Sequence, residues 1–442
     1  MAMEYSQAIK WFYSLEGRGI KFGLENIKKL LNFFGNPHWS LRVVLIAGTN
    51  GKGSVASYLS HILSCAGLKV GLYTSPHLVT LRERVCLVEK GRRRFIPKRD
   101  FQGLTEELSF SLPRIFEKEN GFPTFFEVLT ALAFRYFFQE EVDVAVMEVG
   151  MGGRLDATNI SHPSLTLITN VSKEHTAYLG KDIPTITKEK AGTLRPFVPL
   201  LTTCEGKSLQ VLKEICGEKK VPLYYWKKDF WGRSEEREGH QLLYIKGIQG
   251  EYKGLKTKLL GEWQVKNSTL AVSASEVLRK NFPQIREESV RKGIELTEWP
   301  GRMEKIPGNP PFILDGAHNP MGAYYLSKEM DKWKKRGEKI LLIFGVLQDK
   351  DRKKIMSLLF PRAEKIFLTQ PSSRRAVSPQ VLFEESKKWR GKIYPFLRVE
   401  EALHSAKAEK DFLVLVTGSL YLVGEVRKNL LNLRGDEYVE RI

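Results

Sequence analysis

The sequence predicts an α/β protein of two domains, each built around a mainly parallel β-sheet. Short apolar runs alternate along the chain with stretches in which apolar residues recur at helical spacing. Such alternation is typical of parallel sheets with helical crossovers. It ends before Trp299 and starts again at Phe312. At 442 residues, the chain is also longer than one ordinary hydrophobic core.

The first predicted domain spans residues 1–298. It opens with short helices over residues 5–40, and residues 126–137 again have helical spacing. Strands are predicted at 43–46, 69–73, 142–149 and 165–170, with further β elements at 221–226 and 241–246. A helix containing Asn267 follows them, so the domain is predicted to be a mainly parallel sheet with helical crossovers.

The second predicted domain spans residues 299–442 and is a smaller, Rossmann-like α/β domain. It begins at the helix-breaking cluster Trp299–Arg302. Strands are predicted at 312–314, 339–344 and 412–416, with helical patterns between them. It lacks the GxGxxG pattern, so we do not predict a dinucleotide site there.

The formal net charge of +19 has three explanations. It could serve nucleic-acid binding, attract a polyanionic small substrate, or reflect a solvated lysine-rich surface. The basic clusters at residues 90–94 and 332–336 resemble a loop and a helix end. Because no nucleic-acid-binding module is recognisable, we favour the solvated surface, followed by the anionic substrate, and expect no nucleic-acid partner.

The cellular location is predicted from cysteines and hydropathy. The four cysteines are scattered and form no CxxC pair, which argues against a disulfide framework or a zinc site. No apolar run reaches membrane-spanning length, and the first residues lack a signal-peptide pattern. We therefore expect a cytoplasmic protein with no membrane association.

The most informative stretch is the glycine-rich loop between the first strand and its helix. Its residues are Gly48, Thr49, Asn50, Gly51, Lys52, Gly53 and Ser54. A strand, a glycine loop, a lysine, a hydroxyl and a helix form a phosphate-binding arrangement, in which the hydroxyl can face magnesium. The match is imperfect, because Ile46 replaces the first glycine of the standard pattern and Ser54 comes one position late.

Three more polar side chains follow predicted strands. They are Ser75, Glu148 and His175. Because ligands of parallel sheets bind at the carboxyl ends of the strands, we expect these residues beside the glycine loop. A carboxylate there suits magnesium, although Glu148 could instead be solvated at the strand end. His175 is more ambiguous, because lone histidines are usually structural and magnesium prefers oxygen.

Other candidates have an equally good structural explanation. Lys190 reads as part of a helix end, where cations complement the helix dipole. Asp315 and His318 could hold substrate or phosphate, or form an Asx turn before the next helix. Phe126 could stack on an aromatic ligand, although aromatic residues beside a helical stripe are more often core.

Taken in order, these motifs resemble the folylpolyglutamate synthase/dihydrofolate synthase family of the Mur ligase superfamily. The resemblance rests on residues 48–54, 74–78, 148–159, 175–176, 189–192, 301–302 and 315–320, and covers nearly the whole chain. The shifted glycine loop is the form found in that family.

The resemblance implies an ATP-dependent amide ligase. ATP would phosphorylate a folate carboxylate, and the amine of L-glutamate would attack the acyl phosphate. The acceptor would be a folate or dihydropteroate, because the family includes enzymes with one or both activities. A bifunctional, monomeric enzyme is expected. The alternatives are a Mur-type ligase acting on a cell-wall precursor and a basic ATPase that binds nucleic acid.

The resemblance also assigns roles to residues. Magnesium, as two ions, would be held by Ser54, Ser75, Glu148 and His175. ATP would contact residues 48–54, Asn267, Arg302 and Asp315, and the catalytic residues would be Lys52, Lys190, Asp315 and His318. Lys190 matches a lysine that is carbamylated in relatives, and Phe126, Ala157 and His318 would bind substrate. Ser268 stands where the family usually has alanine.

Overall fold

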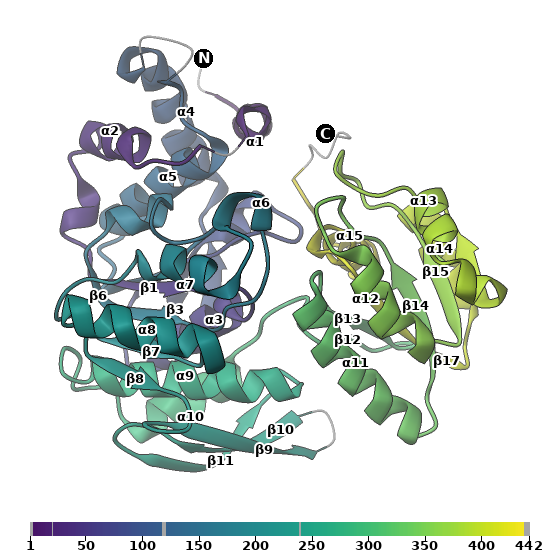
Figure 1. Ribbon diagram of the computed structural model, residues 1–442. Helices are drawn as coiled ribbons and strands as arrows, with labels where there is room; N and C mark the ends of the chain where they lie inside the picture. The colour runs from purple at the N-terminus through teal and green to yellow at the C-terminus, as the bar shows by residue number, and fades with distance from the viewer. Residues whose placement is uncertain (1–2, 20, 117–120, 238–239, 437–442) are drawn as a thin grey trace. The chain divides into compact units, whose positions relative to one another are not determined.

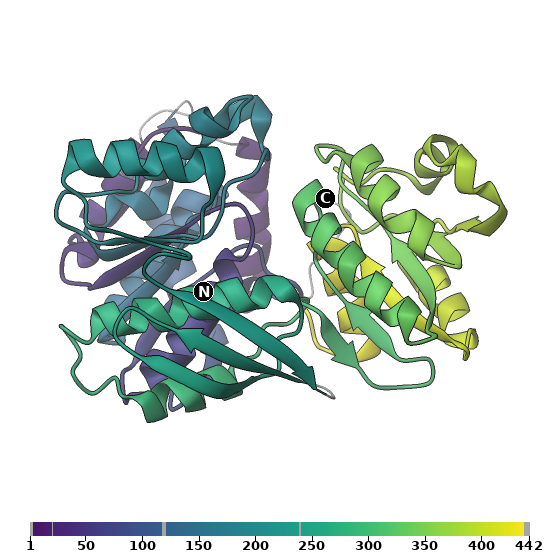
Figure 2. The same cartoon turned by 60° about the horizontal axis from the view of Figure 1, so that its bottom comes forward.

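The computed structural model describes residues 3–19, 21–116, 121–237 and 240–436. The chain forms two compact units, drawn in Figures 1 and 2. The first comprises residues 1–75, 82–258 and 264–298, and the second comprises residues 76–81, 259–263 and 299–442. That the chain divides after residue 298 into two domains that can fold independently stays a prediction.

The first unit is built on a mainly parallel sheet, in the order β4-β3-β2-β5-β1-β6-β7-β8 within the described residues. Its strands are β1 (Val43–Ala47), β2 (Val70–Tyr73), β3 (Val85–Glu89), β4 (Arg92–Phe95), β5 (Val144–Glu148), β6 (Pro163–Ile168), β7 (Leu200–Thr202) and β8 (Leu223–Tyr225). In the run β2-β5-β1-β6-β7-β8 all neighbouring strands pair in parallel. Strand β3 pairs antiparallel with both of its neighbours, β2 and β4. Every residue of β1 and β5 is buried, as expected of central strands covered on both faces.

Helices make up much of the rest of the first unit. They are α1 (Tyr5–Ser14), α2 (Glu25–Phe33), α3 (Lys52–Cys65), α4 (Lys98–Ile115), α5 (Phe125–Gln139), α6 (Thr176–Leu179), α7 (Ile183–Ala191), α8 (Gly206–Lys219), α9 (Glu262–Leu278) and α10 (Glu287–Leu296). Helix α3 packs against β1, β2 and β5, and α10 packs against α3. Helices α1, α2, α4 and α5 gather at one end of the unit (Figure 1).

A small antiparallel sheet, prominent in Figure 2, completes the first unit. It consists of β9 (Trp231–Arg237), β10 (His240–Lys246) and β11 (Glu251–Thr257). Helix α10 packs against β11, and β10 alternates between buried and half-buried residues. The sheet therefore has one face turned toward the core.

The second unit has its own mixed sheet, in the order β12-β13-β17-β14-β15-β16. The strands are β12 (Glu304–Ile306), β13 (Phe312–Leu314), β14 (Lys339–Phe344), β15 (Lys365–Leu368), β16 (Ile393–Pro395) and β17 (Phe412–Thr417). The helices are α11 (Pro320–Lys335), α12 (Arg352–Leu359), α13 (Pro379–Glu385), α14 (Val399–Ala408) and α15 (Leu420–Leu430). Only β12 runs antiparallel within the described part of this sheet.

The predicted fold class is confirmed, since both units are α/β with mainly parallel sheets. The basic cluster at 90–94 is not a plain loop, because Arg92–Phe95 forms β4 of a hairpin. The cluster at 332–336 does end a helix, α11. Among the described residues, no helix combines the length and apolarity needed to cross a membrane.

Candidate active site

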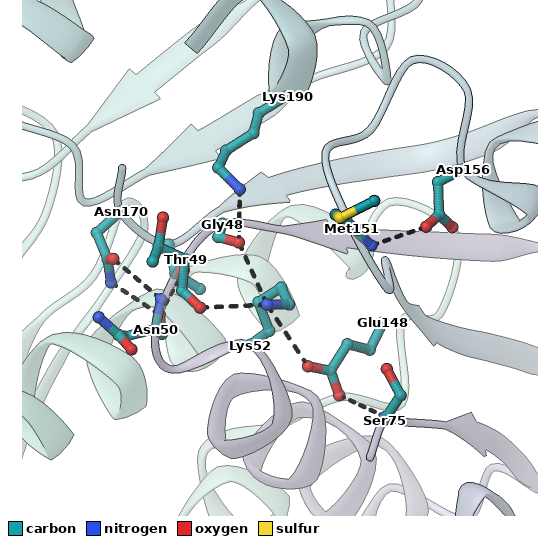
Figure 3. Close-up of polar contacts among 11 residues, drawn as sticks. Gly48, Thr49, Asn50, Lys52, Ser75, Glu148, Met151, Asp156, Asn170 and Lys190 are labelled. Carbon is teal, nitrogen blue, oxygen red and sulfur yellow. Dashed lines mark hydrogen bonds and ion pairs between the residues drawn. The ribbon is translucent and has the colours of Figure 1, made fainter. Parts of the chain in front are cut away.

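The glycine loop lies between β1 and α3 and is held by the end of β6. The amide of Thr49 donates to the Asn170 carbonyl (2.8 Å), and that of Asn50 to the Asn170 side-chain oxygen (3.1 Å). In return, Asn170 Nδ2 and Thr169 Oγ1 each donate to the Asn50 carbonyl at 2.7 Å (Figure 3). These hydrogen bonds fix the shape of the loop.

Any other residue would be strained at two of the glycines in this loop. Gly48 and Gly51 have φ angles of 141° and 87°, which favour glycine. A β-carbon on Gly48 would overlap the Thr169 hydroxyl, and one on Gly51 would overlap the Asn267 side-chain oxygen. The loop thus packs closely against β6 and α9.

Lys52 turns back over the loop. Its Nζ donates to the carbonyls of Gly48 and Thr49, both at 3.2 Å, and lies 3.9 Å from Glu148 Oε1 (Figure 3). Its side chain is 15 % exposed, so this cation is largely withdrawn from water. A positive charge with this placement can meet a phosphate held by the loop.

Glu148 ends β5 and links the loop to Ser75. Its carboxylate is buried, and Oε2 accepts a hydrogen bond from the Ser75 amide (3.1 Å). Burying a carboxylate is costly unless it is paired, and Lys52 and the Ser75 amide supply that pairing. The strand-end positions predicted from the sequence, Ser75, Glu148 and the glycine loop, thus form one connected cluster.

His175 comes from the neighbouring strand connection. It precedes α6 on the segment after β6, in a left-handed backbone conformation with φ 51°. Since β2, β5, β1 and β6 are adjacent in the sheet, Ser75, Glu148, the loop and His175 follow four neighbouring strands. His175 is half-buried.

Lys190 is a buried lysine in α7 whose amine reaches the glycine loop. Its Nζ donates to the Gly48 carbonyl (2.9 Å) and its side chain is almost fully buried (Figure 3). Burial, followed by the nearby Lys52 charge, lowers the pKa of Lys190 to about 7. Near neutral pH a large share of these amines is therefore uncharged and nucleophilic.

The loop that follows β5 is fixed by a buried carboxylate. Asp156 accepts hydrogen bonds from the amides of Met151 (2.9 Å) and Thr158 (3.0 Å) and from the Thr158 hydroxyl (2.6 Å). Burial raises the pKa of Asp156, although these hydrogen bonds act in the opposite direction. Asp156 thereby sets the path of the chain between Glu148 and Ala157.

The two first-unit residues predicted to bind substrate flank that loop. Phe126 is half-buried on α5, with its ring 5.9 Å from that of Tyr73, and a β-carbon on Gly150 would lie 2.6 Å from it. Ala157 is buried at the start of a 3-10 turn (Ala157–Ile160). The sequence left core packing open for Phe126, and these contacts are compatible with it.

Helix α9 contributes two side chains beside the loop. Gln264 Nε2 donates to Ser54 Oγ (3.4 Å), and Asn267 Nδ2 donates to Gln264 Oε1 (2.9 Å). Asn267 lies against Gly51, beside the loop that the sequence assigned to nucleotide. Sequence reasoning did not find Gln264 or Asn170, because a lone amide on a helix or at a strand end has no motif of its own.

The second unit gathers Arg302, Asp315 and His318. Asp315 is buried and accepts hydrogen bonds from the amides of Met303 (3.1 Å) and Ala317 (3.0 Å). Burial raises the pKa of Asp315, and the Arg302 charge opposes that shift. His318 Nδ1 lies 2.8 Å from the Gly316 carbonyl. The hydrogen bond from the Ala317 amide to Asp315 forms the Asx turn that was one of the two alternatives considered from the sequence.

Comparison with known proteins gives a consistent result. Residues 46–275 match the Mur ligase middle domain, and residues 301–420 match the Mur ligase glutamate ligase domain. The chain is 32 % identical to the dihydrofolate synthase/folylpolyglutamate synthase of Bacillus subtilis, over 97 % of this chain and all of that protein. It is 35 % identical to a probable bifunctional folylpolyglutamate synthase/dihydropteroate synthase of Haloferax volcanii, but spans only half of that protein's length.

Solved structures agree. Folylpolyglutamate synthase of Mycobacterium tuberculosis, crystallised with ADP and AMPPCP, has a TM-score of 0.89 and 28 % identity over 98 % of this chain and all of that one. A folylpolyglutamate synthase complex with AMPPCP and folate has a TM-score of 0.84 and 29 % identity over 97 % of this chain and all of that one. The likeness thus includes proteins solved with nucleotide and with folate.

Proposed function

Because the chain belongs to the Mur ligase family, in the group of folylpolyglutamate and dihydrofolate synthases, we propose that it is an ATP-dependent ligase that adds L-glutamate to folates. The observation that carries this proposal is the cluster of glycine loop, Lys52, Glu148 and Ser75, joined by direct contacts. The relatives solved with nucleotide and folate support ATP and a folate as its ligands.

The proposed reaction activates a carboxylate, because a carboxylate is a poor electrophile. A folate carboxylate oxygen attacks the terminal phosphorus of ATP, and ADP leaves. The amine of L-glutamate then attacks the acyl carbon, phosphate leaves and an amide remains. The protein's task is to hold the reacting groups and offset the charge on the transferring phosphoryl group. The amides of residues 51–54 and the Lys52 amine would contact the phosphates.

We assign magnesium to Ser54, Ser75, Glu148 and His175. The buried carboxylate and the two hydroxyls are the hard oxygen donors that magnesium prefers, so these residues fit the ion. Within the described ranges, no group of three or more His, Cys, Asp or Glu side chains could hold a metal, so substrate phosphates and water would complete the coordination. When bound, magnesium would neutralise charge on the transferring phosphoryl group.

We also propose that Lys190 is carbamylated, as the family resemblance implies, and its environment supports this modification. A neutral amine is needed to react with carbon dioxide, and the pKa of about 7 supplies one. The modification would replace a cation beside Lys52 with an anionic oxygen ligand. We expect Lys190→Ala to abolish ligation without unfolding the protein. Activity regained with short-chain carboxylates would support the carbamate, and near-normal activity without rescue would exclude it.

The remaining roles are proposed from placement. Phe126 and Ala157 would contact the pterin end of the acceptor, and Asn267 the nucleoside. In the second unit, Arg302, Asp315 and His318 would contact phosphates and glutamate. We further propose a monomer that works in the cytoplasm without nucleic acid, which fits the free cysteines at 65, 86, 204 and 216. No gel shift at physiological salt is expected.

A paired ligation assay tests the function. The protein would be incubated with MgATP and L-glutamate, with dihydropteroate in one series and tetrahydrofolate in another. Mass spectrometry would detect glutamate addition, and released phosphate would be measured in parallel. We expect product from both acceptors, which makes the enzyme bifunctional. Product from one acceptor would assign a single activity. No product from either, with ATP still bound, would favour a cell-wall ligase.

A further inference from the structure

The loop after β5 and the last turn of α7 lie directly against each other in the first unit. A β-carbon on Gly153 would lie 2.8 Å from the Lys190 carbonyl oxygen and 2.9 Å from that of Glu189. A β-carbon on Gly192 would overlap the Arg154 side chain. Both positions therefore need glycine, because the two backbones approach too closely for a side chain between them.

Asn159 joins these two segments. It lies in the 3-10 turn Ala157–Ile160 and is only 4 % exposed. Its Nδ2 donates to the Arg154 carbonyl (2.9 Å) and to the Gly192 carbonyl (3.2 Å). One side-chain amide therefore uses both of its protons to tie the loop after β5 to the end of α7.

Arg195 holds the oxygen of this amide. Its Nη2 donates to the side-chain oxygen and to the carbonyl of Asn159, both at 2.9 Å, and its Nη1 donates to the Gly192 carbonyl (3.1 Å). Because a guanidinium only donates, it requires the amide oxygen opposite it. The Asn159 protons are consequently directed at the two carbonyls that they meet.

A further contact lies on the other side of the junction. The Arg154 amide donates to the Glu189 carbonyl (2.9 Å), and the Arg154 guanidinium lies 3.0 and 3.2 Å from Glu189 Oε1. The ion pair is exposed and contributes little by itself, but the amide satisfies a carbonyl in the last turn of α7. We call this group of residues the α7 clasp: Arg154, Asn159, Glu189, Gly192 and Arg195.

The clasp surrounds the lysine whose amine reaches the glycine loop. Lys190 follows Glu189 directly, and its Nζ donates to the Gly48 carbonyl (2.9 Å; Figure 3). Helix α7 has only nine residues, a length at which an isolated helix is marginal in water. The position of the lysine backbone therefore depends on tertiary contacts, and the position of its amine follows from that of its backbone.

We propose that Asn159 is a positioning residue for Lys190. Through the carbonyls of Arg154 and Gly192 it holds the end of α7 on the loop after β5, and thereby keeps the Lys190 amine at the Gly48 carbonyl. The proposal rests on the function assigned above for the use made of Lys190, whereas the placement itself depends only on contacts within the first unit.

Helix α8 is the competing support, because it packs beside α7. If α8 alone held α7, Asn159 would stabilise the fold and the Lys190 amine would stay in place without it. The two possibilities differ in what happens to Lys190 when the Asn159 protons are removed.

The test uses the full chain and four variants. Asn159→Ala removes both donors and the acceptor. Asn159→Asp keeps the shape and the acceptor for Arg195 but has no proton for the two carbonyls, so the test stays decisive if Asn159→Ala fails to fold. Arg195→Met removes the guanidinium that orients the amide. Leu108→Ala, a buried residue of α4 outside the clasp, is the control for lost stability alone.

The readout is the acetylation of Lys190 by trace acetic anhydride as a function of pH, in buffer free of carbon dioxide. Acetic anhydride reacts with the neutral amine, so the midpoint of the pH profile reports the surroundings of that amine. Mass spectrometry compares Lys190 with the exposed Lys188 of the same helix as an internal standard. Neither nucleotide nor folate is needed.

We expect the parent midpoint to match the Lys190 pKa of about 7. In Asn159→Ala and Asn159→Asp it should rise by about one pH unit or more, because an amine that leaves its buried position is better solvated as a cation. The ratio of neutral to protonated amine then falls about tenfold at a given pH. Arg195→Met should act in the same direction by less, and Leu108→Ala should match the parent.

An unchanged midpoint in both Asn159 variants would overturn the proposal and leave α8 as the support of α7. An equal rise in Leu108→Ala would overturn it too, because lost stability alone would then release the lysine. If the parent protein ligates neither acceptor, the proposed function fails by itself. The acetylation profiles still decide whether Asn159 places Lys190.

Discussion

Lys190 illustrates what burial does to one side chain. Its amine is buried, donates a hydrogen bond to the Gly48 carbonyl and lies near the charge of Lys52. Burial of the amine, followed by the Lys52 charge, disfavours its protonated form, so the folded protein holds Lys190 at a pKa of about 7 against an ordinary value of 10.5. Burying this lysine therefore lowers the free energy of unfolding wherever the unfolded chain would hold the proton.

That cost predicts a pH-dependent gain in stability for Lys190→Met. Between about pH 7 and pH 10.5 the unfolded chain keeps a proton that folded Lys190 has released, so parent stability rises with pH across this window. Below pH 7 Lys190 is protonated in both states, and the folded protein bears the whole free-energy cost of burying the charged amine. Lys190→Met should thus be more stable by about 2 kcal/mol or more near pH 6, and the difference should vanish above pH 10.5.

Urea unfolding in buffer free of carbon dioxide measures this difference. Lys188→Met, which replaces an exposed lysine on the same helix, is the matched control and should show no such trend. A Lys190→Met gain that is constant from acid to alkaline pH would contradict the depressed pKa.

Glu148 allows a test of metal binding that leaves its neighbour in place. Glu148→Gln keeps an oxygen for the Ser75 amide but removes the negative charge. We expect the magnesium concentration for half-maximal activity to rise about tenfold or more. Nucleotide affinity without magnesium serves as the control and should stay near that of the parent. An unshifted magnesium titration would refute the ligand role.

At the scale of residues, the sequence predicted the glycine loop, Ser75 and Glu148 because they carry a spacing signal. Glycines, a lysine and a hydroxyl between a strand and a helix form a pattern, as does a carboxylate closing an apolar strand. Lys190 was found only through the family resemblance, because its burial is created by the fold. Asn170 and Gln264 were missed for the same reason.

At the scale of elements, the end of β6 determines the shape of the phosphate loop. Asn170→Ala removes the amide that both donates to and accepts from Asn50. We expect AMPPCP affinity to fall about tenfold, because the loop must then be ordered by the ligand. Isothermal titration calorimetry measures this loss. Thr169→Ser, which keeps the hydroxyl that donates to Asn50, should bind within about twofold of the parent.

Burial explains only part of which strands the sequence predicted, because the short buried strands β3, β7 and β15 were missed. Strands β1, β5 and β14 are nearly continuous apolar runs because both faces are covered, and the sequence predicted all three. The hairpin strand β4 and the exposed β9 are rich in charged residues, so no apolar period reveals them. Their pairing with partner strands, rather than their composition, makes them strands.

At the scale of the whole molecule, the charge of +19 predicts a salt effect on long substrates. If the basic surface attracts polyglutamate chains, raising salt well above about 0.1 M, where the Debye length is about 10 Å, should weaken that attraction. The KM of a pentaglutamate folate should then rise about fivefold, and that of a monoglutamate by less than about twofold. If salt changes the KM of both substrates equally, the basic surface does not attract polyglutamate, and the charge reflects only a solvated lysine-rich surface.

The division into two units was only partly accessible from the sequence. The restart of strand–helix alternation near Phe312 predicted a second α/β domain after Trp299. The attachment of residues 76–81 and 259–263 to that unit depends on contacts between distant segments, which no local pattern records. Limited proteolysis around residue 299 would test the predicted boundary.

The loop after Ser75 also has a consequence for the order of events at the ribosome. Thr80, whose hydroxyl donates a hydrogen bond to the Asp436 carboxylate (2.8 Å), leaves the exit tunnel early, but Asp436 follows 356 residues later. At elongation rates of about 5–20 residues per second, that interval is on the order of tens of seconds. The nascent chain can therefore form the contacts of its glycine loop long before the hydrogen bond between Thr80 and Asp436 can form. If this hydrogen bond is needed for ligation, the enzyme begins to work only after Asp436 has left the ribosome.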